Sequence, residues 1–316
     1  MDSGLRSLLS DHSRYVESFR LFLLNSTEHQ CMQRFIDTQF PHIVSSIGKD
    51  KSVIDILGIG SGSGEIDLQM IGKIQSRHPG VAISNQIVEP SAEQIIGYKE
   101  RVAKAPNLGA VSFSWHRQTS SEYERQVNEE KQMRSYDFIH MIQMLYYVKD
   151  VPATLRFFKS CLAPNGKLLI ILVSGNSGWS MLWKKHGPRL PLNDLCLYVT
   201  AGDIAQMLSS MGTRFQSYEL PSDMDITECF IEGDRNGEML LDFLTETCDF
   251  KRNAPADLRE QILCDLKSPE CSTTRDGKLQ LKQREMFWIN KLDTIWPRGL
   301  NREYTPAMFI FKLLTR

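Results

Sequence analysis

A glycine-rich turn between a strand and a helix constrains this chain most. A largely apolar run at residues 53–57 leads into four glycines, at every second position of 58–64, and a helical pattern begins at Glu65. The apolar run predicts a buried parallel strand, because helices cover both faces of such a sheet. Glycines accept positive φ and let a ligand approach the backbone closely. The helix that follows offers free N–H groups to that ligand.

The spacing of these glycines argues against a dinucleotide. The fingerprint G-x-G-x-x-G fails in both registers, because Ser63 or Glu65 stands where its third glycine belongs. The remaining G-x-G-x-G resembles the looser turn of methyltransferases that use S-adenosylmethionine (SAM), a cofactor without a pyrophosphate to anchor. Taken alone, the turn is equally compatible with nucleotide binding or a structural role.

The next strand strengthens the interpretation. Residues 82–88 read as a strand that ends at Glu89, and Ser91 is placed to cap a helix over 93–104. A carboxylate at the tip of the second strand can accept both ribose hydroxyls of a nucleoside. The alternative is an exposed loop acid, but the position after a glycine-rich unit favours ribose binding.

Composition narrows the class of protein. The chain has 316 residues, 41% of them hydrophobic, and a formal net charge of −1, which suits one large α/β domain with an added subdomain. No basic stripe is present, so nucleic acid is not an expected partner. The seven cysteines are scattered without C-x-x-C spacing and no histidine cluster occurs, which predicts reduced thiols, no metal and a cytoplasmic protein. The apolar run at 21–24 is too short for a membrane span.

Strands and helices alternate after the glycine turn. Strands are expected at 110–115, 136–142 and 167–173, with a helix at 151–162. This alternation predicts an α/β fold, a Rossmann-like, doubly wound, mostly parallel sheet. Two helices are expected before the first strand, at 13–24 and 26–43. After the alternating region, helices are expected at 201–211, 236–250 and 256–267, and a strand at 215–220.

Candidate site residues cluster after the fourth strand. Ligands of open α/β sheets bind at the carboxyl ends of the strands, where Gln143, Tyr146 and Tyr147 stand. Trp179 and Trp183 are four residues apart and would share one face of a helix. Each aromatic residue alone is more typical of a core. Together they could also surround an amine through cation–π contacts.

Four stretches resemble the histamine N-methyltransferase family, namely 26–32, 88–94, 137–150 and 242–248. The resemblance extends over residues 1–282 and implies methyl transfer from SAM to an imidazole ring nitrogen. It implies SAM contacts at Gly60, Glu89, Gln94, Ser120 and Ile142. It implies polar substrate contacts at Glu28 and Gln143, and a pocket wall of Tyr146, Tyr147, Trp179, Trp183, Cys196 and Phe243.

No catalytic acid or base is expected in this chemistry. An imidazole with a pKa of about 6.5 is mostly neutral in the cytosol, so its free nitrogen can act as the nucleophile. Rate enhancement then comes from holding the nitrogen and the methyl group in line. Glu28 is expected to orient the substrate and Gln143 to hold the ring tautomer.

Domain limits follow from this resemblance. We expect a helical cap at 1–50 that contributes to the substrate site, and a SAM-binding domain at 51–220 with a lid segment at 175–200. A helical insertion on the substrate side is expected at 221–282, and a divergent tail at 283–316. The partner is a small imidazole amine, and a monomer is the default expectation.

Three departures from the family pattern leave alternatives open. Leu9 and Leu190 replace phenylalanines, which implies a roomier pocket, and Gln283 replaces a substrate-binding asparagine. The apolar run at 307–314 could replace the final strand, or the tail could leave an unpaired sheet edge. The alternatives are therefore a carnosine or histidine-derivative N-methyltransferase, and a non-catalytic methyltransferase-like protein.

Overall fold

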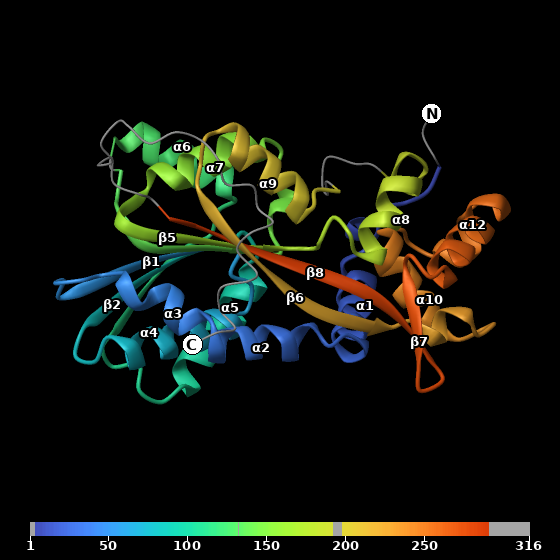
Figure 1. Cartoon of the computed structure of the whole chain (residues 1–316), viewed down its shortest axis with the longest axis horizontal. Helices are drawn as coiled ribbons and strands as arrows, with labels where there is room; N and C mark the ends of the chain where they lie inside the picture. Colours follow the sequence, from blue (N-terminus) through green and yellow to red (C-terminus); the bar gives the residue numbers. More distant parts are fainter. Residues whose placement is uncertain (1–3, 132, 192–197, 291–316) are drawn as a thin grey trace, which may run out of the picture.

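The computed structural model describes residues 4–131, 133–191 and 198–290, with side chains described as far as Lys282. Its sheet has the order β3-β2-β1-β4-β5-β8-β6, with β7 paired to β8 (Figure 1). The parallel strands are β1 (Val53–Ile59), β2 (Ala82–Val88), β3 (Val111–His116), β4 (Tyr136–Ile142) and β5 (Leu162–Leu172). The antiparallel strands are β6 (Phe215–Asp225), β7 (Ser272–Arg275) and β8 (Lys278–Asn290). Strand order reverses between β1 and β4, and open α/β sheets bind their ligands at such a switch point.

Helices cover both faces of the sheet, as Figure 1 shows. One face carries α6 (Ser120–Glu130), α7 (Val151–Ser160) and α9 (Ala201–Ser210). The other carries α2 (Glu28–Thr38), α3 (Phe40–Ile43), α4 (Glu65–Arg77) and α5 (Ala92–Lys104). Side chains of the central strands alternate between the two cores: Phe138 belongs to one, Ile139 and Met141 to the other. The predicted doubly wound α/β fold is confirmed.

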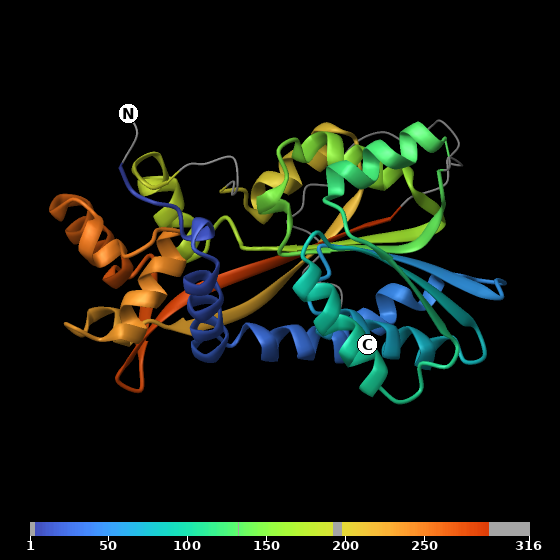
Figure 2. The same ribbon diagram turned by 180° about the vertical axis from the view of Figure 1, so that it is seen from behind.

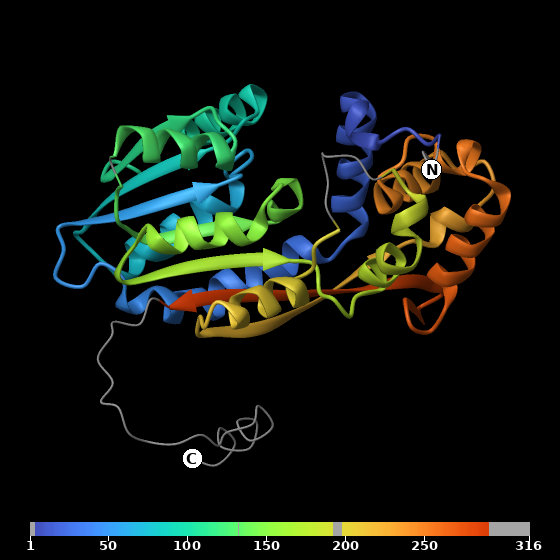
Figure 3. The ribbon, with the colours of Figure 1, turned by 90° about the horizontal axis from the view of Figure 1, so that it is seen from above.

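A helical subdomain lies beyond one end of the sheet. It contains α8 (Gly178–His186), α10 (Arg235–Thr245), α11 (Phe250–Asn253) and α12 (Ala256–Lys267). Strands β6 and β8 extend from the sheet to this subdomain (Figure 3). Helix α1 (His12–Asn25) packs against α10, as the view from behind also shows (Figure 2). Short 3-10 turns complete the chain: η1 (Leu8–Ser10), η2 (Val44–Ser46), η3 (Leu145–Tyr147), η4 (Gly187–Arg189) and η5 (Thr227–Phe230).

The predicted end of the sheet needs a correction. Strand β8 continues through the expected boundary at 283 and inserts between β5 and β6, where Leu168 pairs with Ile289 and Tyr218 with Met286. The alternative in which the tail leaves an unpaired sheet edge is therefore wrong. The sequence Phe287-Trp288-Ile289 has high strand propensity, which is consistent with this pairing. The run at 307–314 lies outside the described residues.

Candidate active site

The glycine turn after β1 is closed to larger side chains. Gly60 and Gly64 have φ of 67° and 75°, in the left-handed region. A Cβ atom on Gly60 would stand 2.7 Å from the Cβ of Met144, and one on Gly64 would stand 2.2 Å from the ring of Tyr98. Glycine is thus required here both for backbone conformation and for space.

Glu89 lies directly against this turn. Its buried carboxylate accepts the backbone N–H of Gly62 on Oε2 at 2.9 Å and that of Ser91 on Oε1 at 2.9 Å. The N–H of Gly60 donates to the carbonyl of Val88 at 2.8 Å, which joins the turn to the end of β2. Each carboxylate oxygen has a further lone pair. Glu89 can therefore also accept a pair of hydroxyls.

The other predicted cofactor positions lie along the same edge of the sheet. Ile142 is the last residue of β4, and Ser120 is the first residue of α6 after β3. Gln94 on α5 places its Oε1 3.9 Å from where a Cβ of Gly62 would stand. The structure thus brings the five predicted positions to the carboxyl ends of β1 to β4. A carboxylate with further lone pairs beside a glycine-rich turn fits a nucleoside-bearing cofactor.

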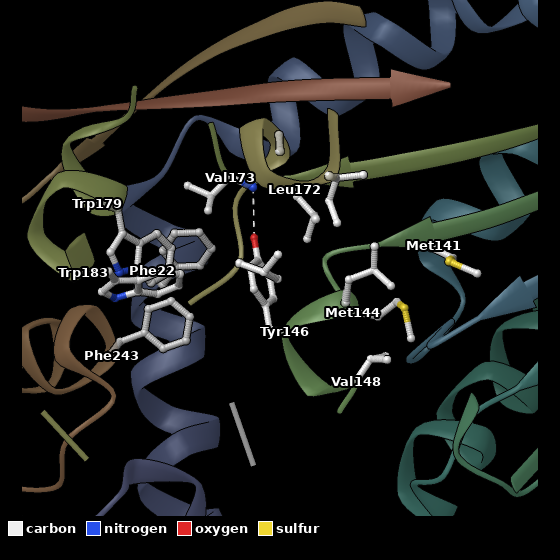
Figure 4. Packing of buried hydrophobic residues seen from close by; sticks show 14 of the residues in the cluster. Phe22, Met141, Met144, Tyr146, Val148, Leu172, Val173, Trp179, Trp183 and Phe243 are labelled. Atoms are coloured by element: carbon white, nitrogen blue, oxygen red, sulfur yellow. Dashed lines mark hydrogen bonds between the residues drawn. The ribbon is translucent and has the colours of Figure 1, made fainter. Parts of the chain in front are cut away.

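A chain of hydrogen bonds joins the segment after β5 to the first residue of α2. The N–H of Val173, after β5, donates to the Tyr146 hydroxyl at 2.9 Å (Figure 4). That hydroxyl donates to Oε1 of Gln143 at 2.7 Å, and Nε2 of Gln143 donates to Oε1 of Glu28 at 2.7 Å. Glu28 is the first residue of α2 and half-buried. The chain thus fixes which end of the Gln143 amide faces the carboxylate.

Gln143 has an unusual backbone conformation. Its φ is 51°, in the left-handed region that a non-glycine residue adopts at a cost of about 1 kcal/mol. Its N–H donates to the carbonyl of Ile171 at 2.9 Å, which holds the residue beside β5 immediately after β4 ends. Backbone strain of this kind is concentrated at functional sites.

A cluster of aromatic side chains adjoins the polar chain at Tyr146. Trp179 and Trp183 lie on α8, as predicted for one helix face, and both indole N–H groups donate to the Leu244 carbonyl, at 3.0 and 3.1 Å. The ring of Trp179 lies 5.4 Å from that of Phe243, and the ring of Trp183 lies 6.0 Å from that of Tyr146 (Figure 4). These four predicted residues form one wall.

Helix α1 adds aromatic residues that the sequence analysis missed. The ring of Phe22 lies 4.8 Å from that of Phe243, and the Tyr15 ring lies 6.3 Å from it. The Tyr15 hydroxyl is 3.4 Å from that of Tyr147, a residue that is 47% exposed. The signal was present, because Tyr15, Phe19 and Phe22 have helical spacing within a predicted helix.

The remaining predicted residues have varied positions. Leu190 is buried in the same core as Trp183, and Leu9 packs against it from η1. Gln283 pairs with Ser222 through the strand backbone, and its side chain lies outside the described part. Cys196 also lies outside the described residues. Within the described ranges, no helix has the length and apolar character to cross a membrane.

Comparison with known proteins shows the family to which the chain belongs. The methyltransferase domain family matches residues 32–217. A histamine N-methyltransferase from Xenopus tropicalis is 99% identical over 279 residues, covering 88% of this chain and 95% of that protein. The chain belongs to the histamine N-methyltransferase family. The predicted enzyme class is therefore confirmed.

Two further similarities bear on this histamine N-methyltransferase family member. Carnosine N-methyltransferase 2 from Gallus gallus is 51% identical over 276 residues, covering 87% of this chain and 85% of that protein. A solved Bacillus halodurans protein assigned as a methyltransferase has a TM-score of 0.50 at 8% identity, covering 81% of this chain and 99% of that one. The latter likeness concerns the fold, which is that of class I methyltransferases.

Proposed function

We propose that this chain transfers the methyl group of SAM to an imidazole ring nitrogen of histamine, as the name of its 99% identical relative indicates. The observation that carries the proposal is the chain from Val173 through Tyr146 and Gln143 to Glu28. It places a carboxylate and an oriented amide beside the edge of the sheet that holds the glycine turn. An amine bearing an imidazole has the matching groups.

SAM would be held by Gly60, Glu89, Gln94, Ser120 and Ile142, and when bound it supplies an activated methyl group on a sulfonium. Glu89 would accept the ribose hydroxyls while it retains the N–H of Gly62. The turn at Gly60 brings the backbone close to the cofactor, because no side chain intervenes. Met144 packs against Gly60 and so links this turn to the segment that carries Gln143.

Glu28 binds the ammonium group of histamine. A carboxylate accepts more than one donor, so Glu28 can bind the substrate and the Gln143 amide together. The hydrogen bond between the ammonium group and Glu28 is charge-assisted, and the half-buried position of Glu28 strengthens it. Gln143 presents its amide to the imidazole ring, and the Tyr146 hydroxyl fixes the orientation of that amide.

The aromatic wall stabilises the charge that develops on the ring. A neutral imidazole becomes cationic when its nitrogen gains a methyl group, and aromatic faces attract such a cation. Residues Tyr146, Tyr147, Trp179, Trp183, Cys196, Phe243 and Gln283 would form this pocket. No protein base is required, because imidazole with a pKa of about 6.5 is largely neutral near pH 7. Orientation and exclusion of water supply the rate enhancement.

The organisation proposed for this activity has four parts. Residues 1–50 cap the substrate site, 51–220 bind SAM with a lid at 175–200, and 221–282 complete the substrate side. The divergent sequence at 283–316 begins within β8 and so contributes its first residues to the sheet. We place the working form in the cytoplasm as a monomer. The six cysteines within the described ranges are free thiols, which supports a reducing compartment.

A larger imidazole is the second candidate substrate. Leu9 and Leu190 are smaller than the phenylalanines expected at these positions, and both belong to or pack against the core that contains Trp183. That observation favours carnosine. The higher identity to a histamine enzyme, 99% against 51%, favours histamine.

Methyl transfer from labelled SAM tests the proposal. The purified full chain is assayed with histamine, carnosine and 1-methylhistidine side by side. A higher kcat/KM for histamine supports the proposed substrate, whereas a preference for carnosine assigns Leu9 and Leu190 to a widened pocket. Absence of transfer to all three, with SAM still bound, contradicts the enzyme and supports a non-catalytic protein.

A further inference from the structure

A buried polar network lies beneath the glycine turn, apart from the aromatic wall. The Tyr98 hydroxyl on α5 donates to Oδ2 of Asp67 at 3.2 Å, and the amide of Asn85 on β2 donates to the Tyr98 oxygen at 3.3 Å. Nε2 of His140 on β4 lies 3.5 Å from the same Asp67 oxygen. All four residues are at most 3% exposed. The network therefore ties together α4, α5, β2 and β4.

Two members of the network directly support the turn. A Cβ atom on Gly64 would stand 2.2 Å from the Tyr98 ring, and one on Gly58 would stand 2.8 Å from Nε2 of His140. Tyr98 thus packs against the turn at Gly64, and His140 packs against the end of β1 that leads into it. Asp67 is the third residue of α4, the helix that begins immediately after Gly64. Any movement of Tyr98 or Asp67 would move the turn.

We propose that Tyr98 and Asp67 are positioning residues for the cofactor, because their hydrogen bond holds the glycine turn in the conformation that SAM requires. The inference rests on the proposed function, since it takes SAM as the cofactor. Gly60, Gly62 and Gly64 all have positive φ, and glycines populate many other conformations when unsupported. Ordering such a segment on binding weakens affinity, and an already ordered turn avoids that loss.

The electrostatic setting strengthens this bond. Asp67 lies in the first turn of α4, where the helix dipole favours a negative charge. Burial lowers the pKa of His140, against the opposing effect of the Asp67 charge, so this ring is neutral near pH 7. The hydroxyl of Tyr98 consequently donates to a carboxylate that no cation neutralises within the network. Hydrogen bonds to such a carboxylate are among the stronger ones in proteins.

Tyr98→Phe tests the proposal, because it removes the hydroxyl and keeps the ring beneath Gly64. We expect the Kd for SAM to rise about tenfold, the change that corresponds to loss of ~1.4 kcal/mol. At saturating SAM, kcat and the KM for histamine should equal those of the unchanged chain. Tyr136→Phe is the matched control. Tyr136 is the first residue of β4, and its buried hydroxyl donates to Oε1 of Gln86 at 3.1 Å. Its Kd for SAM should stay within about twofold.

Calorimetric titration of SAM into the full-length chain provides the readout, with melting temperatures measured in parallel. An unchanged Kd in Tyr98→Phe overturns the inference, as does an equal rise in the KM for histamine. If Tyr98→Phe melts below the titration temperature, Asp67→Asn, which keeps the side-chain shape, replaces it under the same criteria. If the unchanged chain fails to bind SAM, the proposed function itself is wrong, so the two failures are distinguishable.

Discussion

Gln143 and Glu28, 115 positions apart in the sequence, meet through a 2.7 Å hydrogen bond from Nε2 to Oε1. The bond joins the loop after β4 to the first residue of α2. A segment that precedes the sheet in sequence therefore completes a site at its carboxyl edge. The Tyr146 hydroxyl donates to the oxygen of the same amide, so the amide nitrogen is the end that faces Glu28.

Tyr146→Phe should weaken histamine binding and leave SAM binding unchanged. The substitution keeps the ring beside Trp183 but removes the bonds to Gln143 and Val173. We expect the KM for histamine to rise about five- to tenfold, which corresponds to the loss of one or two neutral hydrogen bonds. Steady-state kinetics at saturating SAM measures this. Tyr218→Phe on β6 is the control, and an equal effect there would refute a specific role for Tyr146.

Gly60→Ala should abolish measurable SAM binding. The new Cβ would meet Met144 at 2.7 Å, and φ of 67° is strained for alanine. Gly80→Ala is the matched control, because φ there is 81° but nothing lies within 4 Å of its Cβ position. The control should lose about 1 kcal/mol of stability with an unchanged Kd for SAM. Calorimetry with both variants separates strain from blocked space.

Arg14→Met should destabilise the contact between α1 and α10. The guanidinium pairs with Asp242, a fully buried carboxylate that also accepts the N–H groups of Asp249 and Phe250. Loss of one partner of such a pair costs about 3 kcal/mol. Urea denaturation measures the free energy of unfolding.

Arg20→Met provides the control for this pair, because Arg20 forms an exposed ion pair with Glu17 on the same helix. The melting temperature of the Arg20→Met variant should be almost equal to that of the unchanged chain. Equal destabilisation in both variants would show that Arg14 acts through general helix effects rather than through Asp242.

Glu246 should make stability fall as pH rises. Its carboxyl group is buried, and burial raises its pKa from 4.5 to about 8. Between these values the unfolded chain has released a proton that the folded chain retains, so the contribution is complete below pH 4.5 and is lost as pH rises towards 8. The slope is about 1.4 kcal/mol per pH unit.

Glu246→Gln removes this dependence, because an amide does not titrate. The stability of the variant relative to the unchanged chain should therefore increase between pH 5 and pH 8, a window set by the raised pKa. Urea denaturation at three pH values across this window provides the measurement. A stability difference that is constant with pH would contradict the assignment of this proton to Glu246.

Local sequence patterns predicted the sheet core well, because strand and helix signals there are short-range. The apolar run before Gly58, the cap at Ser91 and the strand ending at Ile142 all lie where expected. Helix α6 was missed, although Thr119 and Glu122 form a capping box that marks its start. Its few apolar residues gave only a weak periodic signal.

The substrate side depended on long-range contacts that periodicity does not encode. Neither the bond from Gln143 to Glu28 nor the packing of Phe22 on Phe243 can be derived from spacing within one helix. Strand β8 was missed for the same reason, because pairing with β5 and β6 decides its place. The family resemblance supplied the candidate residues, and the tertiary fold brought many of them together.

The most direct test of the account is the KM for histamine of Glu28→Gln, measured with labelled SAM at saturation. We expect it to rise at least about tenfold, because the variant keeps the side-chain shape but loses the charge that binds the ammonium group. The KM for SAM, measured in the same assay, should stay unchanged. An unaltered KM for histamine in this variant would contradict the central claim that Glu28, held by Gln143, binds the substrate.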